Sequence, residues 1–154
     1  MQVDLKIIIL ASDARSYNDA YEVLMAAKLY EKRQMNLSSP ALVCLAFSIE
    51  LHIKLLLRTY DLNVRGHNIE KLIRKLPQNE IACISTHPDF HPTQQREMFF
   101  ENIATASNLF VKTRYYFENM GTLHFNTGFC LTLARIIRKR IVERVPYLSH
   151  DLGI

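Results

Sequence analysis

Four polar side chains interrupt the longest apolar run of the chain, residues 41–57, at every second position: Ser48, Glu50, His52 and Lys54. Because successive residues of a helix turn by about 100°, a helix sorts them into two pairs, Ser48/His52 and Glu50/Lys54, on nearly opposite sides. Glu preceding Lys by four residues is the favourable order for an ion pair along a helix. Two interpretations stay open. In the first, one pair faces solvent and the other makes a satisfied polar contact inside the bundle. In the second, Glu50 and Lys54 project into a cleft and act on a ligand.

Three further residues have chemistry that suits contact with a nucleic acid. His67 follows Gly66 just before a predicted helix, where its ring can either contact a phosphate or pack across the loop. Arg114 lies beside the apolar face of its predicted helix and can pair with Glu50 or bind phosphate. Tyr115 can stack on a base, although an aromatic run at a helix end is more often part of the core.

The last predicted helix carries a basic face formed by Arg135, Arg138 and Lys139. This face is either simply solvated or attracts RNA phosphates with a salt-dependent affinity. The sequence shows no glycine-rich phosphate loop, no nucleophile elbow and no Cys-x-x-Cys pair. We therefore predict no metal site and no cofactor.

The spacing of apolar residues predicts the elements that must position these side chains. We expect an all-α fold, an up-and-down bundle of four to five antiparallel helices, in one domain over residues 1–154. A Ser-x-x-Asp start at Ser16, a Ser39-Pro40 start and an Asn68 cap place helix beginnings. Residues 1–11 can form a strand or a helix, and residues 146–154 are expected to be an irregular tail. The predicted helices cover residues 17–34, 40–60, 69–76, 92–117 and 123–144, with a short helical turn at 80–85.

The amino-acid composition limits the classes of protein to which the chain can belong. The chain has 154 residues, 49% of them hydrophobic, and a net charge of +4, which suits one compact domain and is compatible with a nucleic-acid partner. Its three cysteines lack metal-ligand spacing and are expected to be reduced, buried thiols of a cytoplasmic protein. No apolar segment reaches about 18 residues without charges, so we expect no membrane span.

The order of three short motifs resembles that of the HEPN superfamily (higher eukaryotes and prokaryotes nucleotide-binding). The motifs are Glu50-x-x-x-Lys54, then Gly66-His67-Asn68-Ile69-x-x-Leu72, then Arg114-Tyr115-Tyr116 at the end of a long helix, and the resemblance covers roughly residues 15–145. It implies a small helical bundle that forms a homodimer. Some members are metal-independent ribonucleases of toxin–antitoxin, CRISPR and anti-phage systems. Others are non-catalytic partners of nucleotidyltransferases or bind nucleotides.

The ribonucleases of that superfamily contain an Arg-x(4–6)-His motif. The resemblance implies that Arg144 and His150 correspond to its Arg and His. In those enzymes the Arg and His act at the scissile phosphate, and a pair like Glu50/Lys54 supports them. The match departs from the family pattern at Val145, where a polar residue is usual, and at Pro146, which breaks a helix. Two functions therefore stay open: an RNA-binding protein that is also an endoribonuclease, or a non-catalytic dimeric module that binds a nucleotidyltransferase, an antitoxin or a nucleotide.

Overall fold

A computed structural model describes residues 4–27, 38–91, 97–107 and 126–154, and every regular element in these ranges is helical. The all-α prediction is confirmed. The elements, in chain order, are α1 Leu5–Ala27, α2 Ser38–Arg58, α3 Ile69–Ile73, α4 Gln78–Ser85, α5 Glu97–Ala106, α8 Thr127–Arg144, the 3₁₀ turn η2 Pro146–Leu148 and α9 Ser149–Leu152.

Helix α1 begins at Leu5, twelve residues before the predicted start, so the ambiguous first segment is helical. The carboxylate of Asp4 accepts a hydrogen bond from the Lys6 N–H (2.9 Å) at this end. Ser16 lies inside the helix and is not its cap. The apolar side chains of residues 7, 8 and 10 pack against the core, and this burial extends the helix past the start that capping rules select.

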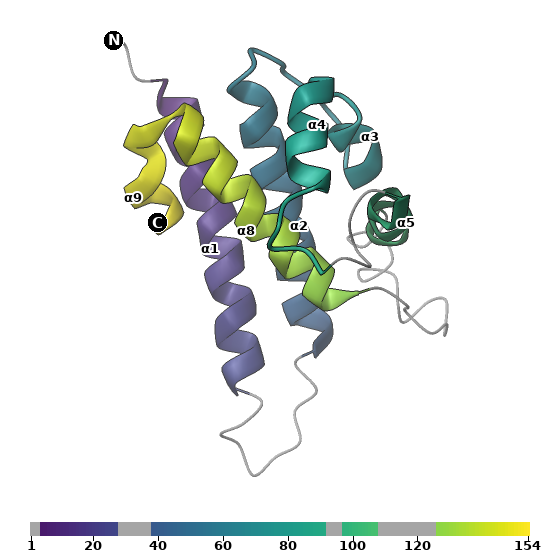
Figure 1. Cartoon of the computed structure of the whole chain (residues 1–154). Helices are drawn as coiled ribbons and strands as arrows, with labels where there is room; N and C mark the ends of the chain where they lie inside the picture. The colour runs from purple at the N-terminus through teal and green to yellow at the C-terminus, as the bar shows by residue number, and fades with distance from the viewer. Residues whose placement is uncertain (1–3, 28–37, 92–96, 108–125) are drawn as a thin grey trace.

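Helices α1 and α2 lie side by side and antiparallel (Figure 1). Small residues permit this close approach, because Ala11 and Ala14 are fully buried. The hydroxyl of Ser48 donates to the Ala14 carbonyl (2.9 Å), and the rings of Tyr17 and Phe47 stack at 5.0 Å between centroids.

Helix α2 is the central helix of the core. Its apolar side chains at positions 45, 49, 53, 55, 56 and 57 are fully buried. Residues Ser39–Arg58 are long and apolar enough to cross a membrane by length and composition alone, and 61% of that window is buried inside the protein. The core helix of a soluble protein passes the same test, so this property carries no conclusion about a membrane.

The two short helices after α2 are separated by a proline. The Asn68 side chain accepts the Lys71 N–H (2.9 Å), so the predicted cap of α3 is confirmed. α3 ends at Ile73, three residues before the predicted end, and α4 begins directly after Pro77. The predicted turn at 80–85 is part of α4.

The C-terminal residues are ordered by burial, so the prediction of an irregular tail is wrong. Pro146 breaks α8 as expected but opens η2, and α9 follows at once. Leu148 and Leu152 are fully buried in the core, and α9 contacts α1. Two leucines four residues apart therefore fix this segment, a spacing too short to stand out in the sequence.

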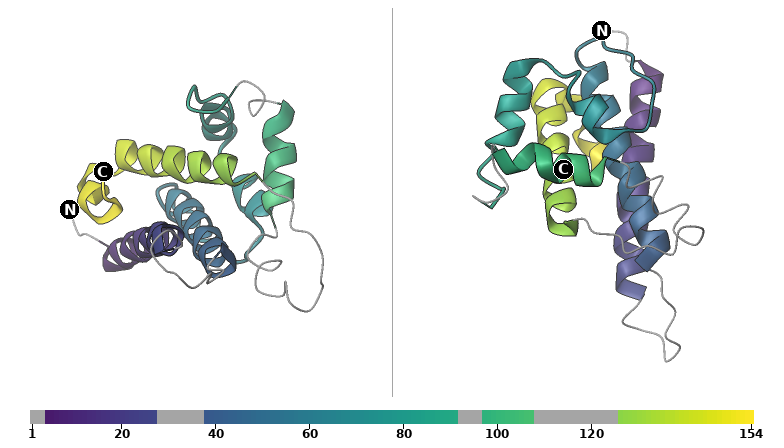
Figure 2. Two further views of the ribbon diagram at one scale, coloured as in Figure 1. Left: turned by 90° about the horizontal axis from the view of Figure 1, so that it is seen from below. Right: turned by 90° about the vertical axis from the view of Figure 1, so that its right-hand side faces the viewer.

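Helix α8 crosses the α1/α2 pair obliquely. It begins at Thr127, where Asn126 caps it, and the first predicted residues, 123–125, lie outside the described ranges. Seen from below, α8 lies between the α1/α2 pair and α4 (Figure 2, left). At one end, the rings of Phe90, Phe99 and Phe129 form a cluster with centroids 5.1 to 5.9 Å apart. The predicted helix 92–117 contains α5, while residues 92–96 and 108–117 lie outside the described ranges.

Candidate functional site

Glu50, Lys54 and His67 form one polar cluster where α2 meets the loop that follows it. The Lys54 Nζ lies 2.6 Å from Glu50 Oε1, one helical turn away. The loop after α2 brings His67 back to the helix, and its Nδ1 lies 3.0 and 3.1 Å from the two oxygens of the same carboxylate. Gly66 permits this turn because its φ of +115° is strained for any side chain. The predicted association of Glu50 with Lys54 is confirmed.

The cluster has a buried acidic side and an exposed basic side. The Glu50 side chain is only 3% exposed, whereas that of His67 is 61% exposed. A buried carboxylate without partners would be costly, and here two cationic or proton-donating groups satisfy it. The carboxylate holds Nδ1 as the proton-bearing nitrogen of the ring, which makes Nε2 the basic nitrogen of the neutral form.

A pocket of about 280 Å³ adjoins this cluster and is lined mainly by one run of sequence. Three of its residues, Arg65, Lys71 and Lys75, are exposed bases, and His67 lies among them. Among the residues that the structure describes, no acid lines this pocket. The lining residues are Val64, Arg65, Gly66, His67, Asn68, Lys71, Leu72 and Lys75. The sequence interpretation singled out only His67 here as a contact for phosphate, although Lys71 lies within the same motif and Lys75 follows Lys71 by four residues.

The second polar pair of α2 is buried and structural. His52 is fully buried, with Nδ1 2.7 Å from the Ser48 carbonyl oxygen and 3.2 Å from its hydroxyl. Burial lowers the pKa of His52 to about 3, and the nearby charge of Arg138 acts in the same direction. The ring is therefore neutral at physiological pH and belongs to the core.

Arg144 and His150 make different contacts in the structure. The Arg144 guanidinium lies 3.6 Å above the Tyr60 ring and donates to the hydroxyl and the carbonyl of Thr59 (2.8 and 3.0 Å). It thus closes the C-terminal end of α2, about 13 Å along the helix from Glu50 at 1.5 Å per residue. His150 is exposed on α9, and its carbonyl accepts from Arg15 (2.8 Å). Pro146 separates the pair by starting a new turn.

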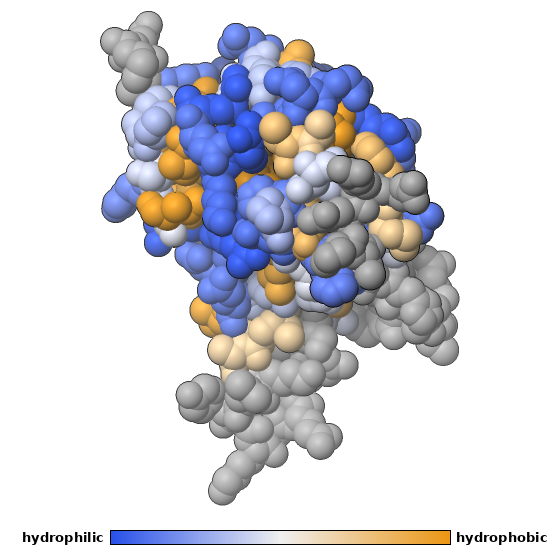
Figure 3. Space-filling view, viewed as in Figure 1, coloured by the Kyte–Doolittle hydropathy of each residue, from blue (hydrophilic) through white to orange (hydrophobic). Residues whose placement is uncertain are grey.

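The basic face of α8 is partly neutralised. Asp89 lies 3.0 Å from Lys139 and 3.5 Å from Arg135, and the hydrogen bond from Lys139 lowers the pKa of this carboxyl group. Arg138 is half-buried, and this burial lowers its pKa. Where α8 crosses the face seen in Figure 3 the surface is mainly hydrophilic, as a solvated helix face would be.

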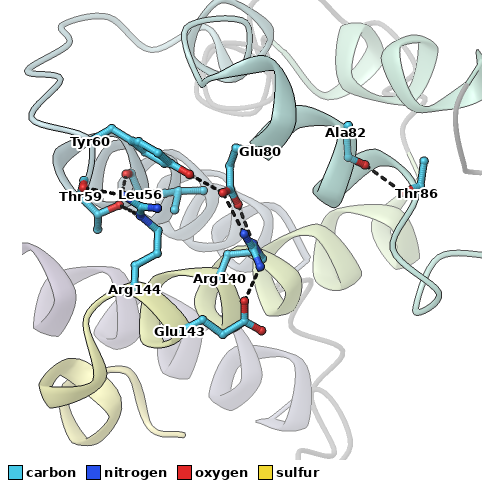
Figure 4. A network of polar contacts seen from close by, with 9 residues as sticks. All are labelled: Leu56, Thr59, Tyr60, Glu80, Ala82, Thr86, Arg140, Glu143 and Arg144. Carbon is cyan, nitrogen blue, oxygen red and sulfur yellow. Dashed lines mark hydrogen bonds and ion pairs between the residues drawn. The ribbon is translucent and has the colours of Figure 1, made fainter.

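A network that the sequence interpretation missed joins α4, α8 and the end of α2 (Figure 4). Glu80 is 1% exposed and accepts two hydrogen bonds from Arg140 (2.6 and 3.0 Å) and one from the Tyr60 hydroxyl. Burial alone would raise the pKa of Glu80, but these bonds outweigh it and the pKa is lowered. Burial and Glu80 together raise the pKa of Tyr60. Each of these side chains has a hydrogen-bonding partner, which indicates that the network stabilises the packing of the helices.

Arg114 and Tyr115 lie outside the described residues, so their predicted contacts stay predictions. Within the described part of the chain, no three His, Cys, Asp or Glu side chains gather as metal ligands. The chain matches no protein-family model, no curated protein and no solved structure. The resemblance to the HEPN superfamily, with its nucleotidyltransferase or antitoxin partners, therefore stays a prediction.

Proposed function

We propose that this protein binds RNA through phosphate groups at the pocket lined by residues 64–75. The observation that supports the proposal is the lining itself, in which Arg65, Lys71, Lys75 and His67 surround a concave surface that none of the described acidic side chains, Glu70 included, lines. Phosphates are attracted to such a surface, and its concave shape strengthens the local field. The basic face of α8 is the weaker candidate, because Asp89 lies between its two exposed cations.

The test compares charge reversal at these two surfaces. The affinity of a labelled single-stranded RNA is measured by fluorescence anisotropy at several salt concentrations. Lys71→Glu/Lys75→Glu is expected to weaken binding about tenfold or more, and to reduce the salt slope by about 1.4, since each phosphate contact with a single strand contributes about 0.7. Arg135→Glu/Lys139→Glu serves as the comparison and should change affinity by about twofold at most.

An equal loss of RNA affinity in both double variants would contradict the proposal. So would a wild-type protein that does not bind RNA at low salt. Competition separates RNA from a smaller ligand. A mononucleotide that displaces RNA at concentrations near its own dissociation constant, with the same dependence on Lys71 and Lys75, would assign the pocket to nucleotides.

A second function, RNA cleavage, is favoured by the contact between His67 and Glu50. A carboxylate-held imidazole beside a phosphate pocket suits proton transfer, because the contact with Glu50 fixes the orientation of the ring. His67 Nε2 takes the proton of the ribose 2′-hydroxyl, the freed oxygen bonds to phosphorus, and the bond from phosphorus to the 5′ oxygen breaks. The leaving oxygen takes a proton from water, and the resulting hydroxide removes the proton from His67. RNA alone offers this internal nucleophile.

Cleavage is tested on the same labelled RNA in EDTA, with a fully 2′-deoxy copy as the control substrate. His67→Gln is expected to slow cleavage about 10²–10⁴-fold while binding stays within a few-fold of wild type. His150→Gln is the matched variant for the competing assignment and should cleave like wild type. RNA that is bound but never cut would remove the catalytic function and leave the binding proposal intact. Loss of cleavage with His150→Gln, but not with His67→Gln, would assign the catalytic site to α9.

A further inference from the structure

Ser107, the residue that follows α5, is bonded to the start of α3, the helix that forms one wall of the pocket at residues 64–75. Its hydroxyl accepts a hydrogen bond from the Glu70 N–H (3.0 Å), and its carbonyl accepts one from the Ile69 N–H (3.3 Å). The same hydroxyl donates to the Ile103 carbonyl (2.7 Å), one turn back in α5. Ser107 is only 3% exposed, so water replaces these bonds poorly when the hydroxyl is removed.

The first four amide groups of α3 are divided between two acceptor residues. Asn68 accepts the Lys71 N–H on its side chain (2.9 Å) and the Leu72 N–H on its carbonyl (3.0 Å), while Ser107 accepts the other two. Asn68 lines the pocket, whereas Ser107 lies outside it. Because α3 has only five residues, it is too short to be stable by itself, and its position depends on such outside contacts.

Helix α5 lies beside α3 and also contacts its other end (Figure 1). The Arg74 guanidinium lies 4.3 Å from the centroid of the Phe100 ring, and its Nε donates to the Glu70 carboxylate (2.9 Å). Neither Glu70 nor Arg74 lines the pocket, so the acid of α3 is paired away from the exposed bases. Contacts with α5 therefore fix both ends of the helix that carries Lys71.

We propose that Ser107 is a positioning residue of the pocket, one that fixes the first turn of α3 and thereby the place of Lys71. This inference rests on the proposed RNA binding at that pocket. Ser107 does not touch the RNA in this role and acts only through α3. Without its hydroxyl, the first turn loses one of its four acceptors and frays. Lys71 then spreads over more positions, and its contact with a phosphate weakens.

Amide hydrogen exchange tests the positioning step without RNA. In Ser107→Ala the Glu70 amide is expected to exchange about tenfold faster than in wild type, because it has lost its acceptor. Ser107→Thr keeps the hydroxyl and should keep the exchange slow. Thr105→Ala is the matched control, because the Thr105 hydroxyl donates to the Glu101 carbonyl (2.9 Å) within α5 and does not bond to α3. This control should leave the Glu70 amide as in wild type.

RNA binding tests the consequence for the pocket, with the labelled single-stranded RNA described above. Ser107→Ala is expected to weaken binding about fivefold and to reduce the salt slope by about 0.7, the contribution of one phosphate contact. Ser107→Thr and Thr105→Ala should bind like wild type. A purely structural Ser107 would lower the stability of the chain and leave the affinity and salt slope of the folded protein unchanged, and this result would overturn the proposal. A Ser107→Thr variant with slow exchange at Glu70 but binding as weak as that of Ser107→Ala would also overturn it.

Failure of this inference differs from failure of the proposed function. If Lys71→Glu/Lys75→Glu weakens RNA binding and Ser107→Ala does not, the pocket binds RNA without the help of Ser107. If neither variant weakens binding, the RNA site lies elsewhere and both proposals are wrong. Unchanged helical circular dichroism verifies that every variant is folded.

Discussion

At the scale of single residues, burial makes His52 sensitive to acid. Its pKa falls from 6.5 to about 3 on folding. Between these pH values the ring is therefore protonated in the unfolded chain and neutral in the folded chain. The contribution of the neutral ring to stability is complete above about pH 6.5 and is lost as the pH falls through this window. One such group changes the free energy of unfolding by up to about 1.4 kcal/mol for each pH unit.

His52→Phe is therefore expected to flatten the acid limb of the stability curve. Urea unfolding at several pH values between about 4 and 7 measures this slope. His150→Gln removes an exposed histidine and should leave the slope as in wild type. Parallel curves for wild type and His52→Phe would show that the ring is protonated in the folded state.

At the scale of elements, the ion pair between Glu80 and Arg140 joins α4 to α8. Its carboxylate is buried and its guanidinium is 25% exposed, so removing the cation leaves an uncompensated buried charge. Arg140→Met is expected to destabilise the protein by about 3 kcal/mol, and adding Glu80→Met should recover most of that loss. The measurement is the free energy of unfolding in urea.

An exposed ion pair provides the control for that experiment. Arg74 and Glu70 pair at 2.8 Å, but their side chains are 54% and 29% exposed. Arg74→Met should cost less than about 1 kcal/mol. A similar loss for Arg74→Met and Arg140→Met, with no recovery in the double variant, would mean that burial of Glu80 does not matter.

The elements were predictable where apolar spacing and capping agree. Asn68 caps α3 as predicted, and α2 follows its apolar run. The start of α1 and the helices after Pro146 were not predictable from the sequence, because burial against other parts of the chain determines where they form. Ile7 and Leu152 are helical because of what they pack against, and that partner surface comes from other parts of the chain.

At the scale of the whole molecule, the same distinction applies to the candidate site. Glu50 and Lys54 were predictable because one helix sets their spacing. The contact of His67 with that pair depends on the path of a loop, and the use of Arg144 on Thr59 depends on how α8 crosses α2. Local spacing therefore identified the polar pair but not the basic pocket beside it.

We propose above that RNA phosphates bind at residues 64–75. The most direct test is a titration of the ¹⁵N-labelled protein with a short single-stranded RNA, followed by amide chemical shifts. We expect saturable shifts concentrated at Arg65, His67, Lys71 and Lys75 and in their immediate neighbours. Shifts that concentrate on α8 around Arg135 and Lys139, or RNA binding that leaves residues 64–75 unperturbed, would contradict it.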